Sequence, residues 1–66
     1  MKASNQLNII RKNLIDLRIQ MRNFKDTFEV EGNEKYATME KFHIEQLNHI
    51  DSELIRLTAF CEEKNV

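Results

Sequence analysis

The sequence contains no proline and no tryptophan, and only one glycine and one cysteine among its 66 residues. Because proline is absent and glycine occurs once, only one place in the chain carries a strong turn signal. A single cysteine cannot form an internal disulfide, and with only two histidines the sequence has no zinc-binding spacing. Chains this short are usually stabilised by disulfides, a metal or self-association, so we expect association with another chain.

Long apolar runs and a large net charge are also lacking. No run approaches the roughly 20 residues of a membrane-spanning helix, and the first residues, MKASNQLN, are too polar for a signal peptide. The net charge of −1 provides no overall field that would attract nucleic acid or an anionic membrane. A lone cysteine is compatible with a reducing compartment. We therefore expect a cytoplasmic protein that does not contact membranes.

The first half of the chain contains an uninterrupted heptad pattern. Every residue at heptad positions a and d is apolar, in the order Leu7, Ile10, Leu14, Leu17, Met21, Phe24 and Phe28. This pattern is typical of a long helix that packs at a coiled-coil angle. We predict a helix over residues 5–29, with Ser4 or Asn5 capping its first turn.

The pattern stops at residues 30–33, where Gly32 can adopt the left-handed conformation that ends a helix. Asn33 is suited to cap a second helix, which we predict over residues 34–61, followed by a frayed tail at 62–66. The predicted packing face of this helix uses two heptad positions. They are occupied by Tyr36, His43, Ile50 and Leu57, and by Leu47, Leu54 and Cys61.

Two long helices joined by a short loop predict an all-α fold, an antiparallel two-helix hairpin that forms a single domain. Residues 1–27 carry a net charge of +4 and residues 28–66 a net charge of −5, which favours pairing of the helices. A hairpin gives each helix only one neighbour. We therefore expect it to complete a four-helix bundle, either as a homodimer or with a partner.

A second set of isoleucines lies outside the heptad pattern. At 100° per residue, those of the first helix point away from the centre of its apolar stripe, and those of the second helix are predicted to lie away from its packing face. We expect this set to contact a partner, with arginines of the first helix as a charged rim. The predicted contact residues are Ile15, Ile19, Ile44 and Ile55, and the rim is Arg11, Arg18 and Arg22.

No catalytic, cofactor-binding or metal-binding pattern is present. His43 and His49 are turned to different faces of one helix, so they cannot chelate a single metal ion. There is no glycine-rich phosphate loop, and a hairpin offers no deep pocket for a small molecule. We therefore expect neither an enzyme nor a cofactor. The sequence predicts a small regulator or adaptor, of a phage, plasmid or bacterium, that acts by helix-mediated protein–protein binding.

Two alternatives remain open at this point. The basic residues of the first helix could contact RNA or DNA phosphates; they are Arg11, Lys12, Arg18, Arg22 and Lys25. In length, single short turn and basic first helix the chain resembles the plasmid Rop proteins, which implies an RNA-binding dimer. With Gly32 in the loop and Tyr36 early in the second helix, it also resembles the small YscE-type chaperones of type III secretion.

Overall fold

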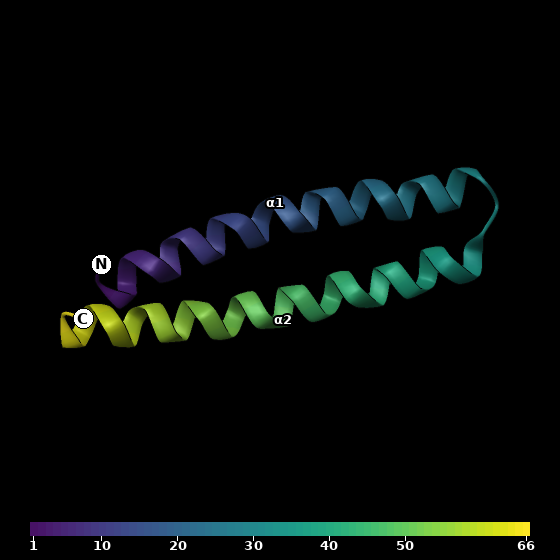
Figure 1. Ribbon diagram of the computed structural model, residues 1–66. Helices are drawn as coiled ribbons and strands as arrows, with labels where there is room; N and C mark the ends of the chain where they lie inside the picture. Colours follow the sequence, from purple (N-terminus) through teal and green to yellow (C-terminus); the bar gives the residue numbers. More distant parts are fainter.

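The computed structural model describes all 66 residues and confirms the predicted all-α antiparallel hairpin (Figure 1). Helix α1 spans Ala3–Val30 and helix α2 spans Glu34–Lys64. The Cα atoms occupy 49 × 17 × 9 Å, so the molecule is a slab two helices wide and one helix thick. Each helix therefore packs against one neighbour, and the slab has two broad exposed faces.

Both helices extend beyond their predicted ends. Helix α1 begins directly after Lys2, and no side chain caps its first turn. Helix α2 continues to Lys64, so the tail predicted to fray is helical over most of its length. The chain then turns at Asn65, whose backbone is left-handed with φ of 57°. The side-chain Oδ1 of Asn65 accepts a 2.9 Å hydrogen bond from Lys2 Nζ. This hydrogen bond joins the two ends of the chain and supports the last turn of α2.

The turn between the helices follows the sequence prediction. Gly32 is left-handed with φ of 79°, a conformation that costs glycine little. Asn33 directly precedes α2, but its side chain forms no cap hydrogen bond, and its carbonyl instead accepts one of 3.0 Å from the Ala37 amide. Glu34 lies in the first turn of α2, at the positive end of the helix dipole.

The face of α1 that packs on α2 differs from the predicted one. Its least exposed residues are Ser4, Leu7, Arg11, Leu14, Arg18, Met21, Lys25 and Phe28. These residues alternate between heptad positions e and a, whereas the prediction used a and d. At position d, Ile10, Leu17 and Phe24 are 49%, 43% and 52% exposed. Three of the seven apolar heptad residues of α1 therefore remain about half exposed in the hairpin.

The packing face of α2 uses two heptad positions, and one of them lies one residue later in the sequence than predicted. Its least exposed residues are Ala37, Glu40, Ile44, Leu47, Asp51, Leu54, Thr58 and Cys61. The predicted members Tyr36, His43, Ile50 and Leu57 are exposed instead. The prediction was wrong because the inward position is occupied partly by small or charged residues, which a search for large apolar residues overlooks.

The hairpin buries very little side-chain surface. Five residues are buried, and none of them is completely inaccessible: Leu7, Ala37, Ile44, Thr58 and Cys61. The Thr58 hydroxyl donates a 2.7 Å hydrogen bond to the Leu54 carbonyl, so this buried polar group is satisfied within its own helix. Cys61 is a free, buried thiol. The core is therefore a single row of contacts between two helices.

Candidate functional site

Two of the three arginines predicted as a partner-binding rim bind across the helix–helix interface. Arg11 Nε donates a 3.3 Å hydrogen bond to Asp51 Oδ1. Arg18 Nη1 lies 3.8 Å from Asp51 Oδ2 and donates a 2.7 Å hydrogen bond to Asn48 Oδ1. The Asp51 side chain is only 15% exposed. These arginines therefore compensate an acidic group in the packing face of α2.

Replacing Asp51 with alanine is expected to lower the free energy of unfolding by about 1–2 kcal/mol, because two partly buried arginines lose their shared acceptor. Urea denaturation followed by circular dichroism measures the change. The control is Glu53→Ala, which removes an exposed acid that pairs only with His49 and should cost less than about 0.5 kcal/mol. Equal effects of the two substitutions would contradict the role assigned to Asp51.

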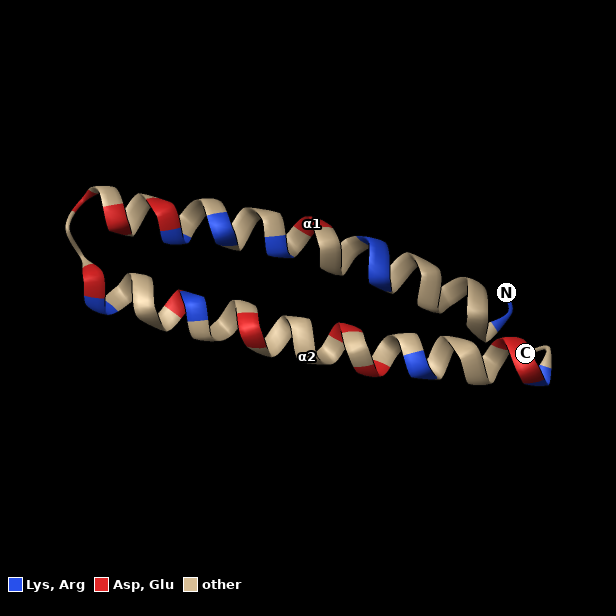
Figure 2. Cartoon of the chain, turned by 180° about the vertical axis from the view of Figure 1, so that it is seen from behind, with Lys and Arg blue, Asp and Glu red and all other residues tan.

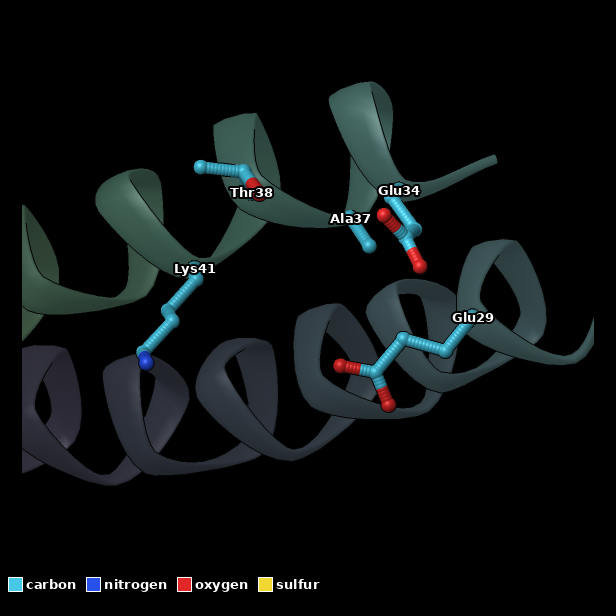
Figure 3. A pocket seen from close by; sticks show the side chains of 5 residues that line it. All are labelled: Glu29, Glu34, Ala37, Thr38 and Lys41. Atoms are coloured by element: carbon cyan, nitrogen blue, oxygen red, sulfur yellow. The ribbon is translucent and has the colours of Figure 1, made fainter. Parts of the chain in front are cut away.

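A depression near the loop contains charges of both signs. It is lined by Glu29 of α1 and by Glu34, Ala37, Thr38 and Lys41 of α2. Figure 3 shows the two glutamates on different helices, with the Lys41 side chain reaching toward α1. Two carboxylates beside one amine select neither an anion nor a cation. Nowhere in the chain do three or more His, Cys, Asp or Glu side chains come together as a metal site would require.

The Lys25 amine lies beside two acids of its own helix, near the same end of the hairpin. Its Nζ atom is 3.1 Å from Asp26 Oδ1 and 3.4 Å from Glu29 Oε1. The hydrogen bond to Asp26, followed by that to Glu29, raises the pKa of Lys25 above its ordinary value. This amine therefore stays charged at neutral pH, and its charge is already compensated within α1.

The two broad faces of the slab differ strongly in composition. One face is formed by two rows of side chains that lie roughly 80° to one side of the packing faces of α1 and α2. Because the helices are antiparallel, the two rows lie on the same side of the hairpin. We call this surface the apolar face, and it consists of Ile10, Leu17, Phe24, Tyr36, His43, Ile50 and Leu57.

Aromatic contacts join the two rows of the apolar face at the loop end. The ring of Phe28 lies between the rings of Phe24 and Tyr36, with centroid distances of 4.6 and 5.7 Å. Tilted aromatic pairs at these distances are favourable beyond their burial of area. The apolar face is therefore continuous across the boundary between α1 and α2.

Charged side chains are absent from the apolar face of α1 and from the flank beside it. Between Ala3 and Phe28, heptad positions a, d and g contain no charged residue. Uncharged polar residues occupy the flank, at Gln6, Asn13, Gln20 and Thr27. This uncharged flank is visible in the sequence and sets one side of α1 apart from its charged remainder.

The opposite face carries most of the predicted contact residues. A depression on it is lined by Ile15, Arg18, Ile19, Arg22 and Asn48. Ile55 of α2 lies on the same side, about half exposed. Ile44, predicted to share a surface with Ile55, is 8% exposed and packs between the helices instead. The one-residue displacement of the α2 packing face explains this difference.

Comparison with models of protein families, with curated proteins and with solved structures finds no significant match for this chain. Neither helix has the combination of length and hydropathy that a membrane-spanning segment requires. The fold and the surface define a class of structure, a two-helix hairpin whose two broad faces differ in composition. Its function is therefore inferred from the chemistry of these two faces.

Proposed function

We propose that this protein is a small non-catalytic regulator or adaptor that acts by binding another helical protein surface. The observation that carries the proposal is the apolar face, which extends over both helices. Ile10, Leu17, Phe24, Ile50 and Leu57 are each between 43% and 52% exposed, so burial by a partner would remove considerable apolar area from water. Large contiguous apolar surfaces on small proteins mark sites of protein interaction.

The distribution of charge supports the same proposal. The cations of α1 all lie away from the apolar face, so a partner can cover this face without desolvating an arginine or lysine of α1. Helical partners are recognised in this way, by apolar side chains at spacings of three, four and seven residues. The proposal includes a cytoplasmic location, with which the lone free cysteine is compatible.

RNA binding, as in the Rop-like alternative, has less support. Arg11 and Arg18 are engaged by Asp51 and Lys25 by Asp26 and Glu29, which leaves Lys12 and Arg22 as the members of the predicted basic set without an ion pair. Bases and acids are interspersed along α2, and on α1 Asp16 interrupts the basic residues while the other acids gather toward the loop (Figure 2). A phosphate backbone requires a contiguous basic surface. The YscE-like alternative has no supporting contact of its own, because Tyr36 packs on Phe28 within the hairpin.

The proposal is tested by immobilising the protein and two double variants and comparing the proteins that each captures from an extract of its own cells. Leu17→Asp with Ile50→Asp places two charges on the apolar face. Ile15→Asp with Ile19→Asp places the same number on the opposite face, at residues of similar exposure. We expect the first variant to lose the bound protein and the second to retain it, as measured by quantitative mass spectrometry. Loss in the second variant alone would assign binding to the opposite face instead.

A further inference from the structure

We propose that the apolar face is covered by a second copy of this chain, stacked with its loop at the same end, so that two hairpins form a four-helix bundle. This inference rests on the proposed function and names its partner. It requires that the face has sufficient area, that the two rows of side chains match in register, and that stacked helices carry opposite net charges.

The area agrees with that of a stable dimer. With Cα extents of 49 and 17 Å, the broad face of the slab offers a footprint of roughly 800 Å², the area that each partner contributes to a typical specific interface. Only five of 66 residues are buried in the single hairpin. A second hairpin adds the second layer that a stable helical domain needs around its core.

The two rows of the apolar face match each other in register. Within the hairpin, Arg18 lies level with Asn48, and Leu17 and Ile50 are within two residues of these positions, about 3 Å along the helix. A two-fold axis parallel to the helices places α1 of one copy over α2 of the other at the same levels. Leu17 of one copy then meets Ile50 of the second copy.

The same match repeats one heptad to either side. Ile10 and Phe24 lie seven residues before and after Leu17, and Leu57 and His43 lie seven residues after and before Ile50. Because α1 and the stacked α2 run in opposite directions, Ile10 meets Leu57 of the second copy and Phe24 meets His43 of the second copy. A heptad spacing in both rows keeps this register along the whole interface.

Charge distinguishes this arrangement from one with the loops at opposite ends. In that alternative α1 would stack on α1 of the second copy and α2 on α2, which places a net charge of +2 over +2 and of −3 over −3. With the loops at the same end, every helix has two neighbours of opposite net charge. All neighbouring helices are antiparallel in both arrangements, so helix dipoles do not distinguish them.

The experiment uses single-cysteine variants in a Cys61→Ala background, together with sedimentation equilibrium of the unmodified protein. A Leu17→Cys chain mixed with an Ile50→Cys chain should form a disulfide-linked heterodimer under oxidising conditions, identified by its mass, because these positions face each other between copies. Each variant alone should form none. Mixing separate chains excludes a disulfide within one hairpin.

Three results would overturn the proposal. Cross-linking of Leu17→Cys chains alone would place the loops at opposite ends. A dimer that cross-links in no sample would refute the register. A monomer at all accessible concentrations would exclude the second copy, but would leave the apolar face available to a different protein, which the capture experiment detects independently.

Discussion

Replacing Leu17 and Ile50 together with aspartate is expected to convert a dimer of this protein into a monomer, weakening association at least a thousandfold. Each substitution occurs twice in a symmetric dimer, so four apolar side chains are lost. Because Leu17 and Ile50 are 43% and 45% exposed in the single hairpin, burying each on association supplies roughly half of the 1.5–3 kcal/mol of a fully buried side chain. Four carboxylates must also be desolvated. A thousandfold change corresponds to about 4 kcal/mol, which is less than these losses together.

Sedimentation equilibrium over a wide concentration range measures this change, with circular dichroism on the same samples to follow helix content. The matched control is Ile15→Asp with Ile19→Asp, which should leave the dissociation constant within a few-fold of the original. Persistence of the dimer in the Leu17 and Ile50 variant would show that the apolar face is not the interface. Dissociation of the control variant would favour the isoleucine surface predicted from the sequence.

Replacing Ile44 with aspartate is expected to unfold the chain, whereas the same change at Ile55 is tolerated. Ile44 is 8% exposed and lies between the helices, while Ile55 is 49% exposed on the same helix. An unpaired carboxylate in the packing face costs several kcal/mol. A core of this size rarely supplies more than about 3–5 kcal/mol, so the substitution removes most or all of the stability.

Far-UV circular dichroism and urea denaturation distinguish the two isoleucine variants. Both are compared at one protein concentration, because association stabilises the folded state. Ile44→Asp should lose most of its helical signal, and Ile55→Asp should lose less than about 1 kcal/mol of unfolding free energy. A helical Ile44→Asp protein with a cooperative transition like that of Ile55→Asp would contradict the packing described for α2.

The hairpin could be predicted from the sequence because its determinants are local. An uninterrupted heptad pattern requires a long helix, and Gly32 is the one residue that readily adopts the left-handed turn between two such patterns. The heptad periodicity does not reveal which neighbour each apolar row contacts. In the sequence, the residues at positions a and d of α1 form one apolar stripe. In the structure, the residues at a pack on α2 and those at d are exposed.

The packing face of α2 was harder to predict for a different reason. At the levels of Ala37, Asp51 and Thr58 the inward residues are small or polar, and larger apolar residues stand beside them on the exposed side. Asp51 is tolerated inside only because Arg11 and Arg18 reach it from α1. Such compensation joins residues far apart in the chain, so it becomes visible only once the helices are placed side by side.

The hydrogen bond between Lys2 and Asn65 joins residues 63 positions apart, whereas Phe28 and Tyr36 meet directly across the turn. Closing a long loop costs more chain entropy than closing a short one. Once the turn at Gly32 has formed, each new contact between the helices shortens the loop that the next contact must close. The hairpin should therefore fold like a zipper from the turn outward, and the contact between the chain ends should form last and open first.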